Sequence, residues 1–131
     1  MFEDDVIFSP NAEAELRDSL EELKQREWSI LALGGHRWER TFEKAPGCRY
    51  LEVPYGMTCT HAVAYNHTVY DRILREVPRT PSKVALWLRS AFGIDQYLME
   101  FDGERLLTSP VIASQGSLLK QETRPFEVDS D

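Results

Sequence analysis

The densest group of potential metal ligands lies at the start of the chain. Glu3, Asp4 and Asp5 are adjacent, with apolar residues on both sides. Three neighbouring carboxylates repel one another, and a hard divalent cation such as Mg²⁺ or Mn²⁺ relieves that repulsion because it prefers oxygen ligands. Ligands of open α/β sheets bind beyond the carboxyl ends of strands, so we expect the triplet at a strand end. The alternative is a solvated acidic segment, which is common on protein surfaces.

Helices and strands alternate along the rest of the chain. Ser9 and Pro10 are typical of a helix start, and leucines at helical spacing extend this helix to about Gln25. The apolar run 28–33 then predicts a buried strand. We expect it to be parallel, because a helix between two apolar strands is typical of a βαβ unit. Further strands are predicted over 49–53, 61–65 and 97–101, and further helices over 66–77 and 80–92.

The composition narrows the class of partner and the compartment. The net charge is −7 and the 15 basic residues are scattered along the sequence, which disfavours nucleic acid and anionic membranes as partners. The chain has no apolar run of about 18 residues and begins without a basic leader region, so we expect no membrane span, no secretory signal and a cytoplasmic location. Cys48 and Cys59 lack the CxxC spacing of a zinc site, and we expect both to be reduced thiols.

A series of short motifs gives the clearest indication of a family. The acidic triplet is followed by a strand from Trp to Gly at 28–34, a Thr-His-Ala strand within 59–65, an Ile-Asp pair at 94–95, and then Pro110, Gln115 and Ser117. In this order and spacing the motifs resemble glycosyltransferase family 25, the lipopolysaccharide-type sugar transferases. The resemblance extends from residue 2 to about residue 119. Cys59 stands where the family usually has glycine.

The resemblance implies a GT-A-like α/β fold, in which helices flank a mostly parallel sheet. It implies a partial glycosyltransferase domain over 1–119, followed by a polar, mobile tail over 120–131. The nucleotide-binding half that begins the family's domain has no match here, because the chain starts at the acidic triplet. We therefore expect that half to be lacking.

The same resemblance implies transfer of a sugar from a nucleotide sugar to a hydroxyl group of a glycan acceptor. Asp5, Asp4 and Glu3 would bind Mn²⁺ or Mg²⁺, which neutralises the diphosphate leaving group. Asp95 would deprotonate the acceptor hydroxyl, as an inverting reaction requires, and His61 would contact the metal or the substrate. The structural alternatives are a turn aspartate at position 95 and a half-buried, hydrogen-bonded histidine at position 61.

Three further residues are candidates for binding the sugars. Gln115 and Ser117 carry polar groups that hydrogen-bond to sugar hydroxyls. Trp38 lies in a polar segment after two glycines, where its ring is free to stack on a sugar. For Gln115 the alternative is an exposed loop residue without a ligand.

A second hypothesis comes from a different class of protein. A truncated relative without catalytic activity would act as a binding or structural module, and the unmatched donor half favours this alternative. A third hypothesis is a small acidic α/β interaction protein. If the donor half is lacking, we expect an exposed strand edge or apolar face, which a partner chain or a homodimer would cover.

Overall fold

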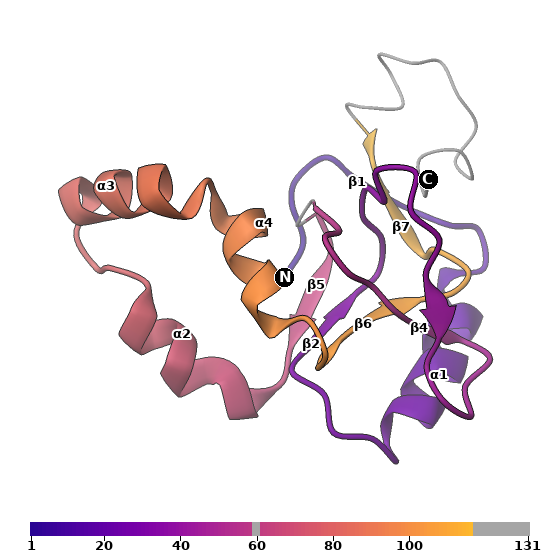
Figure 1. Ribbon diagram of the computed structural model, residues 1–131. Helices are drawn as coiled ribbons and strands as arrows, with labels where there is room; N and C mark the ends of the chain where they lie inside the picture. Colours follow the sequence, from indigo (N-terminus) through magenta and orange to yellow (C-terminus); the bar gives the residue numbers. More distant parts are fainter. Residues whose placement is uncertain (59–60, 117–131) are drawn as a thin grey trace.

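A five-stranded mixed sheet forms the centre of the molecule (Figure 1). The computed structural model describes residues 1–58 and 61–116. Across the sheet the strands follow the order β3 (Glu43–Lys44), β4 (Leu51–Val53), β6 (Arg105–Thr108), β2 (Ile30–Ala32) and β5 (Val63–Tyr65). A separate two-stranded sheet pairs β1 (Val6–Phe8) with β7 (Ala113–Gln115) in antiparallel register.

The prediction of a GT-A-like, mostly parallel sheet flanked by helices is wrong. β2 runs parallel to β6 but antiparallel to β5, and β4 runs antiparallel to both of its neighbours. Helix α1 (Ala12–Leu23) lies between β1 and β2 in sequence, but these strands belong to different sheets and therefore form no βαβ unit. The connection between β3 and β4 is shorter than the dozen or so residues that a parallel crossover needs, and it produces a hairpin instead.

β2 is buried on both faces, as its apolar sequence predicts. On one face, Leu31 packs with Leu106 of β6 and Leu23 of α1. On the other face, Ile30 packs with Val63 of β5 and with helical residues that follow that strand. The centre of the sheet therefore depends on side-chain packing from two sides.

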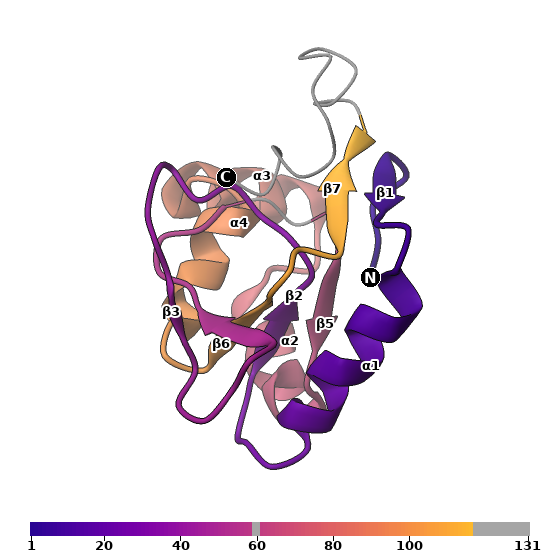
Figure 2. The same ribbon diagram turned by 90° about the vertical axis from the view of Figure 1, so that its right-hand side faces the viewer.

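A run of helical elements connects β5 to β6. It consists of η1 (His67–Val69), α2 (Tyr70–Glu76), α3 (Pro81–Ala91), α4 (Ile94–Tyr97) and η2 (Leu98–Phe101). The two helices predicted in this region are confirmed, but the strand predicted over 97–101 is wrong. Its buried apolar residues Tyr97, Leu98 and Phe101 are spaced as on one face of a helix, and they join the core from that face. Figure 2 shows α1 and α4 on opposite sides of the central sheet.

Helices α2 and α3 form a hairpin that projects away from the sheet (Figure 1). Neither helix contains a buried residue, and the half-buried Trp87 of α3 meets the Tyr97 ring edge-on at 5.1 Å. The Tyr97 hydroxyl donates to the Glu76 carboxylate of α2 at 2.8 Å. That hydrogen bond, together with the bond from Arg72, lowers the pKa of Glu76. The hairpin is therefore held against α4 by the contacts of Glu76 and Trp87 with Tyr97.

The sequence predicted that the chain has no membrane span and that its cysteines are reduced thiols. No helix within the described residues has the length and apolar content needed to cross a membrane, as predicted. Cys48 is a free thiol. Cys59 lies outside the described residues.

Leu107 provides a test of the central sheet. Its side chain is fully buried in β6, where it packs with Ala32 of β2. We expect Leu107→Ala to lower the free energy of unfolding by about 2–5 kcal/mol, because it removes buried methyl groups and leaves a cavity. Leu20→Ala, at an exposed position of α1, should lower it by about 1 kcal/mol or less. Denaturant unfolding followed by circular dichroism measures both, and equal losses would place β6 outside the core.

Candidate functional site

The acidic triplet lies in a turn between two paired segments. The preceding residue, Phe2, forms an antiparallel bridge with the segment that leads into β5, and the Glu3 amide donates to the His61 carbonyl oxygen at 2.9 Å. These bonds extend the central sheet beyond β5. The chain then turns at Asp4 and Asp5 and enters β1. The three carboxylates therefore stand where an extended segment ends, at one edge of the sheet.

β7 closes the turn from the other side. The Gly116 amide donates to the Asp5 carbonyl oxygen at 2.5 Å, and Gln115 pairs with Val6 across the small sheet. Gly116 is buried, and a Cβ atom there would lie 2.7 Å from the same Asp5 oxygen. A side chain at position 116 would therefore displace the turn. This packing brings Gln115 next to the acidic triplet, although the two stand at opposite ends of the described chain.

His61 holds β7 against the turn. The residue is 2% exposed, and its Nε2 lies 2.9 Å from the carbonyl oxygen of Ala113. Because a carbonyl oxygen only accepts hydrogen bonds, Nε2 carries the proton and donates. Nδ1 is buried and has no hydrogen-bond partner within the described residues. The ring thus supports the main chain of β7, which matches the hydrogen-bonded alternative considered for this residue.

Leu33 and Gly34 form a crossing point next to this group. The Leu33 carbonyl oxygen accepts hydrogen bonds from the amides of Ile112 at 2.8 Å and Ala113 at 3.0 Å, and from the Thr108 hydroxyl at 3.3 Å. A Cβ atom at Gly34 would lie 2.0 Å from the Ala113 carbonyl oxygen, so this position requires glycine. The crossing lies just beyond the carboxyl ends of the parallel strands β2 and β6, where α/β sheets bind ligands.

Trp38 presents an exposed side chain four residues beyond Gly34. The residue is 57% exposed, while its Nε1 donates to the Thr58 hydroxyl at 2.9 Å and its ring meets that of His36 edge-on at 4.3 Å. Trp38 and Glu39 have positive φ angles of 54° and 63°. Non-glycine residues in this conformation are strained, a feature that clusters at ligand sites. The contacts hold the indole in place and leave it accessible for stacking.

Two arginines fix the loop that carries Trp38. Arg37 pairs with the Glu52 carboxylate of β4 at 2.9 Å. Arg40 donates to the Gly56 carbonyl oxygen at 2.9 Å. Both bonds join the loop to β4 or to the segment after it, so the position of Trp38 is set by the central sheet.

Asp95, the proposed base, lies on helix α4. It is the second residue of α4, and its Oδ1 accepts a hydrogen bond from the Gln96 amide at 3.0 Å. Ile94, the residue before Asp95, lines an apolar pocket of about 620 Å³ together with Met1. The hydrogen-bonded group around His61 is built from the triplet and β7, whereas Asp95 is carried by a different element, α4.

The carboxylates of the turn are the candidate metal ligands. Within the described residues, no group of three or more His, Cys, Asp or Glu side chains is arranged to hold a metal ion. Mg²⁺ is usually held by one or two carboxylates, with water and substrate phosphates as its other ligands, so the oxygen donors of Asp4 and Asp5 suit such a cation. Asp4 is exposed and Asp5 is half-buried. Ser117, the remaining candidate for sugar binding, lies outside the described residues.

The residues that assemble this group were missed by sequence reasoning. Gly34, Gly116 and the carbonyl group of Ala113 contribute no reactive side chain, yet they bring the candidates together. The Gly34-Gly35 pair after an apolar strand is a signal for this packing, because glycine in such a place marks a close approach of backbone.

Comparisons with known proteins leave the family open. No protein-family model, no curated protein and no solved structure matches the chain. The resemblance to glycosyltransferase family 25 therefore stays a prediction from the motifs.

His61 tests the assembly of the turn. We expect His61→Ala to lower the free energy of unfolding by about 1–3 kcal/mol, because the buried Ala113 carbonyl oxygen loses its donor. Hydrogen exchange should also become faster at the Gly116 amide, which bonds to the turn. His61→Gln keeps an amide donor and should restore part of the loss. His67→Ala, at an exposed position of η1, is the matched control. Similar losses for both alanine variants would contradict the anchoring role.

Proposed function

We propose that the chain transfers a sugar from a nucleotide sugar to a hydroxyl acceptor in a metal-dependent reaction. The observation that carries this proposal is the packing of the Glu3–Asp5 turn between His61 and Gly116. The packing occurs next to the carboxyl ends of β2 and β6, where ligands of α/β sheets bind. The motif order that resembles glycosyltransferase family 25 supports the same function.

Asp4 and Asp5 are the proposed metal ligands. Mn²⁺ or Mg²⁺ bound to them supplies a Lewis acid that neutralises the diphosphate leaving group. The hydrogen bonds from Glu3 to His61 and from Gly116 to Asp5 fix the backbone on both sides of these carboxylates. Fixed ligands need little reorganisation when the donor binds, so the turn contributes orientation as well as charge.

The remaining candidates divide into binding, catalytic and positioning roles. Trp38 offers an exposed indole for stacking on a sugar ring, and Gln115 offers an amide beside the turn for sugar hydroxyls. Asp95 is the proposed base for the acceptor hydroxyl. His61 acts as a positioning residue, because its ring is buried and bonded to β7.

A binding module without turnover is the second candidate function. The carboxylate turn provides metal ligands for the diphosphate of the donor. No residues for binding the base and the ribose are identified among the described residues, and this favours a module without turnover. Such a module would bind a nucleotide sugar with Mn²⁺ but release no nucleoside diphosphate. Measuring calorimetric binding and nucleotide release on the same sample separates the two functions.

Asp5→Asn tests the proposed metal ligands, because it removes one negative charge and keeps the size of the side chain. The assay measures release of nucleoside diphosphate from a panel of nucleotide sugars with Mn²⁺ and glycan acceptors. We expect the rate to fall at least about 100-fold, since neutralisation of the leaving group contributes several kcal/mol. Asp18→Asn makes the same charge change on an exposed position of α1 and should leave the rate unchanged. Wild-type turnover by a folded Asp5→Asn variant would refute this assignment.

A further inference from the structure

The α2–α3 hairpin is basic in an otherwise acidic protein. The segment 66–93 contains five of the 15 basic residues and two of the 22 acidic ones, so it carries a net charge of +3. Since the whole chain carries −7, the remainder carries −10. Arg72 pairs with Glu76 and Glu100 at the base of the hairpin. The other cations of the hairpin are exposed and take part in no ion pair within the described residues. They are Arg75, Arg79, Lys83 and Arg89.

The same hairpin exposes large apolar side chains. Leu74 is 59% exposed, Leu86 is 66% exposed and Phe92, directly after α3, is 81% exposed. Phe92 also has a φ angle of 59°, in the left-handed region that is unfavourable for a bulky residue. The Phe92 backbone caps α3 by donating to the Leu88 carbonyl oxygen, but its exposed ring gains little burial within this chain. Contact with a partner surface would give these side chains a role.

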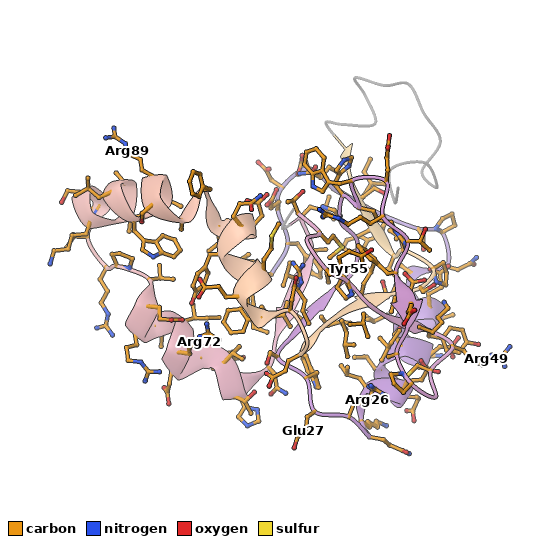
Figure 3. All side chains as sticks on the ribbon, viewed as in Figure 1. Arg26, Glu27, Arg49, Tyr55, Arg72 and Arg89 are labelled. Carbon is orange, nitrogen blue, oxygen red and sulfur yellow. The ribbon has the colours of Figure 1, made fainter. Side chains whose placement is uncertain are left out.

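The outer side of α3 carries both cationic and apolar side chains. Figure 1 shows the hairpin standing apart from the strands, and Figure 3 shows Arg89 on the outer side of α3, directed away from the rest of the molecule. Leu86 lies three residues before Arg89 and therefore on the same side of the helix. Arg72, by contrast, lies over the Phe101 ring at the base of the hairpin. The projecting surface is thus both basic and apolar.

We propose that this surface of the α2–α3 hairpin docks on an anionic lipid bilayer. Interfacial helices combine Lys and Arg with apolar side chains that enter the boundary between headgroups and acyl chains. The exposed cations are attracted to anionic headgroups, while Leu86 and Phe92 enter the interface. The remaining part of the protein, with its charge of −10, is repelled by the same headgroups. This charge separation orients the hairpin toward the membrane.

A lipid surface fits this part of the hairpin better than a protein partner does. Between Leu86 and Phe92 the exposed positions are Leu88, Arg89 and Ser90, so polar side chains interrupt the exposed apolar ones. A stable protein interface requires a packed apolar centre with complementary shape. A bilayer interface receives single side chains without that requirement.

Vesicle flotation of the full chain tests the proposal. We expect binding to phosphatidylcholine vesicles that contain phosphatidylglycerol at low salt, and no binding to phosphatidylcholine alone. Lys83→Gln with Arg89→Gln should weaken binding on the order of 25-fold, since each cation near an anionic surface contributes roughly fivefold. Arg17→Gln with Lys24→Gln removes the same charge from exposed positions on α1 and directly after it, and should leave binding unchanged.

A second pair of substitutions tests the apolar contribution. Leu86→Ser with Phe92→Ser should weaken vesicle binding while circular dichroism shows an unchanged fold. Absence of binding to the anionic vesicles, or an equal loss in the α1 control, would overturn the proposal. Capture of poly-glutamate without vesicle binding would also overturn it in favour of an acidic protein. A dimer that the serine variant dissociates, without vesicle binding, would do so in favour of a second copy. No nucleotide sugar is present, so the result is independent of the transfer reaction.

Discussion

The crossing of the chain at Leu33 and Gly34 determines where the rest of the candidate site lies. The Leu33 amide donates to the segment entering β5, and its carbonyl oxygen accepts from the start of β7. Through these bonds both segments meet the carboxyl end of β2. Gly34 lets the Ala113 carbonyl group approach closely enough to accept a hydrogen bond from the His61 ring. Without this crossing β7 would lose its attachment to the end of β2, and the Glu3–Asp5 turn would lose support for the strand that closes it.

Part of the local structure was predictable from the sequence, but the sheet topology was not. Helix α3 begins at Pro81 and ends before Gly93, and both residues are strong local signals. Strand direction depends on contacts between distant residues, such as the parallel pairing of Ile30 with Arg105. Arg105 also concealed β6, because a charged residue does not predict a buried strand. Its guanidinium is buried against Asp102, and burial lowers the pKa of Arg105 although the aspartate opposes this effect.

The candidate residues were predictable by their chemistry, whereas their surroundings were not. The acidic triplet and Trp38 stand out in the sequence, but the role of His61 depends on a strand that lies about 50 residues away along the chain. The charges show the same limit. Five of the 15 basic residues lie in the one segment 66–93, but only the fold shows that this segment projects from the sheet. The distribution of charge in space, rather than the net value of −7, therefore governs which partners each surface attracts.

Broadening of amide NMR signals by Mn²⁺ tests most directly whether the Glu3–Asp5 turn is a cation site. In the isotopically labelled full chain with a nucleoside diphosphate, the signals of Asp4, Asp5 and Gly116 should broaden at the lowest Mn²⁺ concentrations, because the paramagnetic effect falls steeply with distance. Signals from α1, which is also acidic, should stay sharp under the same conditions. Broadening that is strongest on α1, or a turn whose signals stay sharp when Mn²⁺ and the nucleotide are in excess, would contradict the proposed site.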